Sequence, residues 1–312
     1  MSRPARALLD AGALKHNLQQ VRLHAKRARV MAIVKANGYG HGMTWVARTL
    51  GESADAFGVS SVEEGIQLRV SGVTRPICLL EGFFTVDELP LLSKQHLEPV
   101  IHHDGQLKSL MKASPMLKLT VWIKADTGMH RLGFAPVVVP EVVKQLRSAS
   151  AVAGVRLMSH FARAEFPDDD ATRSQINDFA GVSRNLELET SLANSAGILA
   201  WPSSHLDWVR PGIMLYGASP LVDKDAATIG LKPVMTLESA LIAVHARKKG
   251  DANGYGGDWR CPEDMPVGVV AIGYGDGYPR HAPPGTPVLV NGHRVPTVGR
   301  VAMDMITLDL RT

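Results

Sequence analysis

The first two-thirds of the chain alternate between short apolar runs and longer amphipathic stretches. The apolar runs predict eight β-strands, at residues 30–34, 56–60, 77–80, 98–101, 119–123, 155–158, 188–192 and 206–209. The stretches between them predict helices, such as residues 11–26, 62–70, 107–113, 137–149 and 171–186. Strands separated by helices are typical of a parallel sheet, and eight such units in about 220 residues match the size of a (β/α)8 (TIM) barrel. A doubly wound sheet is the alternative, because the number of strands does not distinguish the two.

After residue 231 the pattern changes to short apolar runs, at residues 240–244, 267–272, 288–290 and 305–310. Turn-forming residues separate them, and an Asn-Gly pair at 291–292 is a strong hairpin signal. This pattern predicts a separate, mainly β domain. We therefore expect a barrel domain at residues 1–230 and a C-terminal β domain at 231–312. The first residues, to about residue 10, are candidates for pairing with the β domain instead.

The composition is that of an ordinary globular protein, with 312 residues of which 45% are hydrophobic and 21% charged. The two cysteines, Cys78 and Cys261, do not make a disulfide framework, which suits a reducing compartment. The net charge is +4, and the one dense basic stretch, residues 24–29, is too short to favour nucleic-acid binding. Neither a signal sequence nor a membrane span is evident. We expect a cytoplasmic protein with no membrane or nucleic-acid partner and no metal site.

Polar residues follow several predicted strands. Lys35 follows the first, Lys124 and Arg131 the fifth, His160 the sixth, Asn194 and Ser195 the seventh, and Arg210 the eighth. In a barrel these positions meet at the C-terminal rim, where active sites are built. The sequence therefore predicts one polar pocket made from residues that are far apart along the chain.

Taken alone, each of these residues has an ordinary structural explanation. A lysine at a strand end is more often a surface residue, and a lone histidine such as His160 is more often a hydrogen-bonded structural residue. Asn194 and Ser195 are equally consistent with a helix N-cap. The glycines of segment 273–277 are most simply turn formers. Only their joint placement favours a functional site.

Seven segments resemble bacterial alanine racemases, which are pyridoxal-phosphate (PLP) enzymes of fold type III. They are residues 34–41, 124–133, 159–162, 208–217, 254–257, 273–279 and 298–304. The segments occur in the family order and span nearly the whole chain. Members of the family continue for several tens of residues past the point matching residues 309–310. The resemblance therefore implies that the family's C-terminal tail, with its second phosphate-binding tyrosine, is absent from this sequence.

The resemblance implies a PLP-binding barrel followed by a β domain. It identifies Lys35 as the lysine that carries the cofactor and as one of two racemising bases. Tyr255 resembles the second base, which in the family reaches the active site of the partner subunit. A complete site would then require a homodimer. Tyr274, Met303 and Asp304 resemble residues of the substrate entrance and the shared pocket.

The resemblance also assigns contacts to the cofactor and the substrate. Tyr39 matches a phosphate-binding tyrosine. The loops after the last two barrel strands, where barrels commonly bind phosphate, contain Asn194, Ser195, Gly212 and Ile213.

Arg210 matches the arginine that faces the pyridine nitrogen, and His160 matches the histidine beside it. An arginine remains protonated and therefore donates to that nitrogen, which weakens the electron sink and favours racemisation over transamination. Arg131 resembles the arginine that contacts the substrate carboxylate and the cofactor's phenolic oxygen. Lys124 matches a position that is carbamylated in some relatives, where it orients that arginine.

The implied function is the interconversion of L-alanine and D-alanine, either to supply D-alanine for peptidoglycan or to serve alanine catabolism. A broad-specificity racemase of small amino acids is one alternative, although such enzymes are commonly exported. A PLP-binding protein that is inactive because of the missing tail is another. Related decarboxylases usually place an acidic residue where Arg210 stands. Non-catalytic PLP-binding proteins resemble only the barrel and lack a residue matching Tyr255.

Overall fold

The computed structural model describes residues 3–311; Met1, Ser2 and Thr312, at the outer ends of the two predicted domains, lie outside the described residues. The chain divides into two compact units. One comprises Asp10–Val234, and the other joins Met1–Leu9 to Met235–Thr312.

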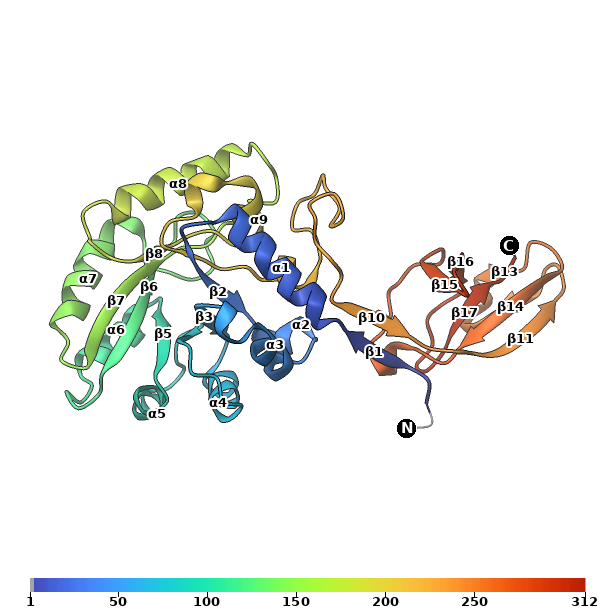
Figure 1. The fold of residues 1–312 in the computed structure, drawn as a ribbon, viewed down its shortest axis with the longest axis horizontal. Helices are drawn as coiled ribbons and strands as arrows, with labels where there is room; N and C mark the ends of the chain where they lie inside the picture. The colour runs from blue at the N-terminus through green and yellow to red at the C-terminus, as the bar shows by residue number, and fades with distance from the viewer. Residues whose placement is uncertain (1–2, 312) are drawn as a thin grey trace. The chain divides into compact units, whose positions relative to one another are not determined.

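The larger unit is a closed parallel barrel (Figure 1). Its strands are β2 (Arg29–Ile33), β3 (Ala56–Val59), β4 (Ile77–Leu79), β5 (Leu97–Ile101), β6 (Leu119–Lys124), β7 (Val152–Met158), β8 (Thr190–Ser191) and β9 (Trp208–Val209). Parallel pairing of β2 with β9, with Arg29 opposite Trp208, closes the ring. The predicted barrel is confirmed, and this closure excludes the doubly wound alternative.

Helices follow the strands around the outside of the barrel (Figure 1). They are α1 (Ala11–His24), α2 (Lys35–Tyr39), α3 (Met43–Leu50), α4 (Val62–Val70), α5 (Leu89–Lys94), α6 (Asp104–Met111), α7 (Val139–Ser148), α8 (Asp170–Ser183) and α9 (Ser195–Ala200). The five predicted helices are present. Helix α6 begins three residues earlier than predicted, because the His103 side chain caps it by accepting from the Gly105 N–H at 3.0 Å.

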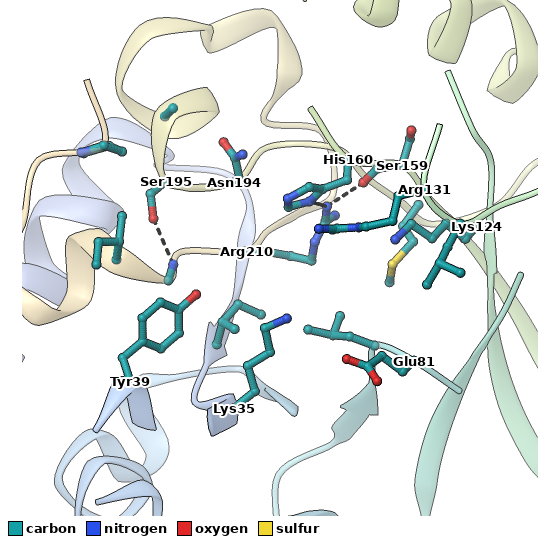
Figure 2. A pocket seen from close by; sticks show the side chains of 18 of the residues that line it. Lys35, Tyr39, Glu81, Lys124, Arg131, Ser159, His160, Asn194, Ser195 and Arg210 are labelled. Carbon is teal, nitrogen blue, oxygen red and sulfur yellow. Dashed lines mark hydrogen bonds between the residues drawn. The ribbon is translucent and has the colours of Figure 1, made fainter. Parts of the chain in front are cut away.

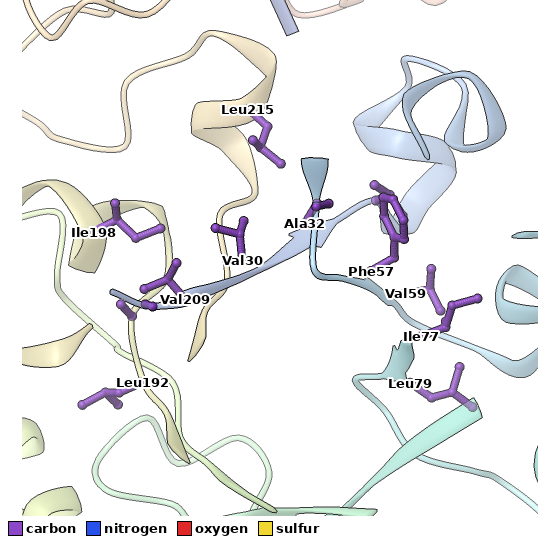
Figure 3. Packing of buried hydrophobic residues seen from close by; sticks show 14 of the residues in the cluster. Val30, Ala32, Phe57, Val59, Ile77, Leu79, Leu192, Ile198, Val209 and Leu215 are labelled. Carbon is purple, nitrogen blue, oxygen red and sulfur yellow. The ribbon is translucent and has the colours of Figure 1, made fainter. Parts of the chain in front are cut away.

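Side chains alternate between the two faces of each barrel strand. On β2, Val30 and Ala32 pack outward against the helices (Figure 3). Met31 and Ile33 belong to a second cluster inside the barrel. The same alternation places Cys78 of β4 inside. Successive side chains of a strand point to opposite faces, so nearly continuous apolar runs fill both layers. Each fully buried aliphatic side chain contributes about 1.5–3 kcal/mol of stability.

Strands β8 and β9 are shorter than predicted, with two residues each. The Asp207 carboxylate accepts hydrogen bonds from the Thr190 backbone N–H at 2.7 Å and from its hydroxyl at 2.8 Å. Leu206, within the predicted strand, has a positive φ of 49°. Side-chain capping and a left-handed residue therefore replace regular strand pairing here.

The second unit is built from antiparallel strands. They are β1 (Arg6–Leu9), β10 (Met235–Glu238), β11 (Leu241–Arg247), β12 (Ala252–Asn253), β13 (Trp259–Arg260), β14 (Met265–Val270), β15 (Pro287–Val290), β16 (His293–Val298) and β17 (Ile306–Asp309). A five-stranded sheet has the order β11-β14-β17-β16-β15, and β1 pairs with β10. Asn291 and Gly292, with φ of 50° and 85°, form the predicted hairpin turn between β15 and β16.

No helix within residues 3–311 combines the length and the apolar character needed to cross a membrane.

Candidate active site

The barrel opens at the C-terminal ends of its strands into a cavity of about 850 Å³ (Figure 2). All the barrel residues predicted for the site line it: Lys35, Tyr39, Lys124, Arg131, His160, Asn194, Ser195, Arg210, Gly212 and Ile213. The structure thus brings together side chains that are up to 178 positions apart in the sequence, from Lys35 to Ile213 (213 − 35). Four of these lining residues are lysines or arginines: Lys35, Lys124, Arg131 and Arg210.

Lys35 follows β2 at the start of an unusual turn. Ala36 (φ 52°, ψ 52°), Asn37 (53°, 43°) and Gly38 (64°, 44°) are left-handed, and Tyr39 has a φ of 53°. This conformation costs an L-residue about 1–2 kcal/mol. The turn points both Lys35 and Tyr39 into the cavity (Figure 2). Such strain is tolerated where the surrounding structure holds it, commonly at functional sites.

One end of the cavity is suited to an anion. Ser195 Oγ accepts from the backbone N–H of Gly212 at 2.9 Å and from that of Met214 at 3.4 Å, which leaves its own hydroxyl hydrogen to donate outward. Burial raises the pKa of Tyr39, so its phenol remains a donor at neutral pH. A Cβ on Gly212 would lie 2.5 Å from the Tyr39 hydroxyl, so a larger residue there would displace that hydroxyl.

Asn194 is the N-cap of α9, with its Oδ1 accepting from the Gly197 N–H at 2.9 Å. The structural explanation given by the sequence is therefore present, while Asn194 also lines the cavity. Ile213, on the neighbouring loop, lines the same end of the site and is 37% exposed.

Arg210 is buried and firmly held. Its guanidinium donates to Ser191 Oγ at 2.6 Å, to the Ser159 carbonyl at 2.5 Å and to the Leu192 carbonyl at 3.3 Å. Burial lowers its pKa to about 10, so it remains a cation at pH 7.

His160 lies beside Arg210, with Nδ1 3.2 Å from the guanidinium. Burial and then the charge of Arg210 lower the pKa of His160 well below its usual value. The ring is therefore neutral at pH 7. Because Arg210 only donates, His160 Nδ1 accepts and its proton is assigned to Nε2.

Lys124 ends β6 and is 9% exposed. Burial, followed by the charges of Arg210, Arg131 and Lys35, lowers its pKa to about 8. Arg131 stands on the loop that follows, which Asp126 shapes by accepting from the backbone N–H groups of Gly128 at 3.1 Å and His130 at 3.0 Å.

Besides Glu165, two ionisable residues that the sequence did not single out line the cavity, Glu81 and His102. Both follow barrel strands, Glu81 two positions after β4 and His102 directly after β5. The rule that located the other residues therefore points to them as well. His102 Nε2 is 3.0 Å from the Glu81 carbonyl oxygen, which ties the two strand ends together.

The remaining predicted residues belong to the β unit. Tyr274, Met303 and Asp304 lie on two segments that are joined by hydrogen bonds from the Tyr274 N–H to the Ala302 carbonyl at 3.1 Å and from the Gly275 N–H to the Met303 carbonyl at 2.7 Å. Tyr255 stands on a separate loop between β12 and β13, where it is 70% exposed.

Residues 9–220 match the family profile of the alanine racemase N-terminal domain, and residues 234–312 match that of the alanine racemase C-terminal domain. This chain belongs to the alanine racemase family. An alanine racemase from Vibrio cholerae is 51% identical over 308 residues, covering 98% of this chain and 85% of that protein. The biosynthetic alanine racemase of Escherichia coli is 52% identical over 308 residues, with 98% and 86% covered.

A solved structure of the family agrees. The biosynthetic alanine racemase from Pseudomonas aeruginosa has a TM-score of 0.96 and 42% identity, covering 99% of this chain and 86% of that one. The family resemblance drawn from the motifs is confirmed, and so is the predicted barrel with its β domain.

Alanine racemases use PLP, and the cavity of this family member fits that cofactor. It offers an amine on Lys35 and, at one end, hydroxyl donors on Tyr39 and Ser195 for a phosphate. The absence of a side chain on Gly212 leaves room against Tyr39. The buried cation of Arg210 provides a donor that does not lose its proton at pH 7.

Proposed function

We propose that this chain interconverts L-alanine and D-alanine with PLP as its cofactor. The observation that carries the proposal is one cavity lined by both Lys35 and the buried, charged Arg210, in a member of the alanine racemase family. The relatives named above are alanine racemases. Their names favour this function over a broad-specificity racemase or an inactive PLP-binding protein.

When bound, PLP supplies an electron sink that weakens the Cα–H bond of an attached amino acid. Lys35 would attach the cofactor through Nζ and, once released by substrate, move a proton at one face of the substrate Cα. Arg210 would donate to the pyridine nitrogen, and His160, which is neutral beside it, would accept from Arg210 and hold its direction. A cation that only donates keeps that nitrogen unprotonated, which favours racemisation over transamination.

The cofactor phosphate would be held by Tyr39, Asn194, Ser195, Gly212 and Ile213. The hydroxyl of Ser195 is free to donate because its oxygen already accepts two backbone N–H groups. The raised pKa of Tyr39 keeps its phenol protonated. Donors that remain protonated at pH 7 suit a phosphate dianion.

Arg131 would bind the substrate carboxylate and the phenolic oxygen of PLP, and Lys124 would orient it. A pKa of about 8 leaves part of the Lys124 amine uncharged at pH 7. Only an uncharged amine attacks carbon dioxide, forming a C–N bond and releasing one proton as the carbamate is made. This property supports Lys124 as a carbamylation site. The resulting anion would pair with the neighbouring Arg131.

The second base would be Tyr255 from the partner subunit of a homodimer, with Tyr274, Met303 and Asp304 lining the shared entrance. The proposal is supported by the resemblance of segments 254–257, 273–279 and 298–304 to the family motifs. The 70% exposure of Tyr255 within its own unit also suits a residue that contacts another subunit.

We further propose a cytoplasmic role in supplying D-alanine for peptidoglycan. The relatives from E. coli and P. aeruginosa are named biosynthetic, which favours this role over alanine catabolism. A strain that depends on added D-alanine tests it. Expression of the chain should restore growth without D-alanine, and expression of Lys35→Ala should not.

The catalytic proposal is tested by purifying the chain with PLP, recording its visible spectrum and assaying L-alanine conversion beside Lys35→Ala. We expect an absorbance band of lysine-bound cofactor and racemisation, both lost in the variant. A band without turnover would contradict the proposed activity. Absence of the band in the unmodified chain would contradict cofactor binding itself.

The dimer proposal is tested by mixing two inactive variants, Lys35→Ala and Tyr255→Phe. In a mixed dimer one site carries both substitutions and the other carries neither. Random exchange of equal amounts should therefore restore about a quarter of the unmodified activity. If each site were complete within one chain, the mixture would remain inactive.

A further inference from the structure

The left-handed turn after Lys35 is only partly explained by its own sequence. Asn37 and Gly38 tolerate the left-handed region, but Ala36 and Tyr39 are L-residues that favour the right-handed one. Contacts from outside the turn must therefore select this conformation.

Glu64 provides such a contact beside Lys35. Its Oε1 accepts from the Ala36 backbone N–H at 2.8 Å, and its Oε2 accepts from the Ser60 backbone N–H at 2.7 Å. Ser60 directly follows β3, and Glu64 lies in the first turn of α4. One partly buried carboxylate thus joins the turn to the end of the adjacent barrel strand.

The geometry of Glu64 departs from what its local sequence predicts. Residues 61–64 have the Ser-x-x-Glu pattern of a capping box, and Ser61 Oγ accepts from the Glu64 N–H at 3.5 Å. In a capping box the glutamate accepts from the N–H of the N-cap residue, here Ser61. Glu64 instead accepts from the preceding residue and from Ala36. Its carboxylate therefore serves the neighbouring cofactor-bearing segment rather than its own helix.

The other side-chain contacts of the turn lie farther from Lys35. Asn37 Oδ1 accepts from the Met43 N–H at 3.0 Å, and the Tyr39 ring stacks on Tyr216 with centroids 4.7 Å apart. Glu64 holds Ala36, the residue where the backbone turns left-handed. It is therefore placed to set the direction of Lys35.

We propose that Glu64 is a positioning residue of the cofactor site, which holds the strained turn so that Lys35 and Tyr39 point into one cavity. This inference rests on the proposed use of Lys35 to bind PLP. Charge-assisted hydrogen bonds to two backbone N–H groups are well suited to fixing a backbone conformation. Figure 2 shows Lys35 and Tyr39 reaching the cavity from this single segment.

The test compares Glu64→Gln with Glu63→Gln in the full chain. Both substitutions remove one negative charge from the first turn of α4, so their effects on the helix dipole cancel. Glu63 is exposed, whereas Glu64 binds the turn. For Glu64→Gln we expect PLP to bind at least ~10-fold more weakly and the Ala36 amide of the apo-protein to exchange ~10-fold faster. Glu63→Gln should stay within ~2-fold of the unmodified chain, and equal effects of the two variants would overturn the proposal.

Rescue by Ala36→Gly separates positioning from a general structural role. Glycine adopts the left-handed conformation without steric cost. Adding Ala36→Gly to Glu64→Gln should therefore recover PLP affinity by ~3-fold or more. A contribution of Glu64 to the stability of α4 alone would not be relieved in this way. If Glu64→Gln does not fold, the double variant is compared with Ala36→Gly/Glu63→Gln, and a double variant that also fails to fold or to recover affinity overturns the proposal.

Alanine racemisation by the unmodified chain is measured in parallel. If that chain binds PLP without turnover, the proposed function fails and the PLP titrations still decide the role of Glu64. If it does not bind PLP, exchange of the Ala36 amide in the apo-protein decides whether Glu64 holds the turn. If it racemises alanine while Glu64→Gln matches Glu63→Gln in both measurements, the Glu64 proposal alone fails.

Discussion

The two ends of the barrel contain similar cations in opposite surroundings. Where the strands begin, Arg29 and Arg156 form ion pairs with Glu189 at 2.5 and 2.8 Å, and Arg156 also pairs with Glu98 at 2.5 Å. The indole N–H groups of two tryptophans bind the same carboxylates, and both guanidinium groups lie over indole rings. Where the strands end, Lys35, Lys124, Arg131 and Arg210 form no salt bridge within residues 3–311.

This difference separates charge used for stability from charge used for binding. Arg29 and Arg156 fill the end of the barrel where the strands begin, and nearby carboxylates neutralise their charge. Burial, followed by the charges of the other rim cations, lowers the pKa of Lys124, so these cations also repel one another. An anion that enters would relieve their repulsion, so the same feature that weakens the empty barrel would favour the phosphate and the carboxylate of the proposed function.

The largest change in stability is expected where the strands begin, at the arginines that pair with glutamates. Arg156→Met leaves the largely buried Glu98 without an ion-pair partner, whereas Glu189 keeps Arg29, so the free energy of unfolding should fall by about 3–5 kcal/mol. Urea denaturation followed by tryptophan fluorescence measures it. Arg184→Met, at an exposed arginine, is the control and should change the free energy by less than about 0.5 kcal/mol. Equal effects of the two variants would remove the distinction between the two ends.

Where the strands end, we expect removal of a cation to raise the free energy of unfolding. Lys124→Met removes a cation whose pKa is lowered from 10.5 to about 8, so the apo-protein should become more stable at pH 7 by roughly 1–3 kcal/mol. The measurement uses urea denaturation in buffer free of carbon dioxide, with Lys144→Met as the exposed control. A loss of stability in Lys124→Met would show that the charge of Lys124 does not destabilise the apo-protein. Added bicarbonate should stabilise the unmodified chain and leave Lys124→Met unchanged if Lys124 is carbamylated.

The smallest expected effect is the pH dependence of the stability cost of the Lys124 charge. The folded pKa of Lys124 lies below its unfolded value, so the unfolded chain binds more protons between the two values and stability rises with pH across that window. From pH 7 to pH 9 the apo-protein should gain about 1 kcal/mol from this residue. The comparison is the same pH series on Lys124→Met, in which this increment should be missing. An identical rise in both proteins would assign it to other groups.

The sequence predicted the barrel because its strands are apolar on both faces, so each appears as a continuous run. It failed where a polar side chain or a proline interrupts the regular pattern. Asp207 shortens β8, and Pro296 concealed β16, which pairs with β15 with Pro287 opposite Pro296. The rim could be located because strand ends converge in a barrel. The handedness of the turn after Lys35 could not, since Ala36 and Tyr39 have no intrinsic preference for it and a carboxylate 28 positions from Ala36 selects it.

The pairing of β1 with β10 also has a consequence for how the chain assembles. Arg6 and Glu238 lie opposite each other on these strands, although 232 positions separate them in the chain. During synthesis from the N-terminus, β1 leaves the ribosome long before its partner exists, while every strand of the barrel is completed in between. The barrel can therefore fold as a unit first, and β1 must wait with an exposed edge until residues 235–238 emerge. Closure of so large a loop makes this short ribbon a late step of folding.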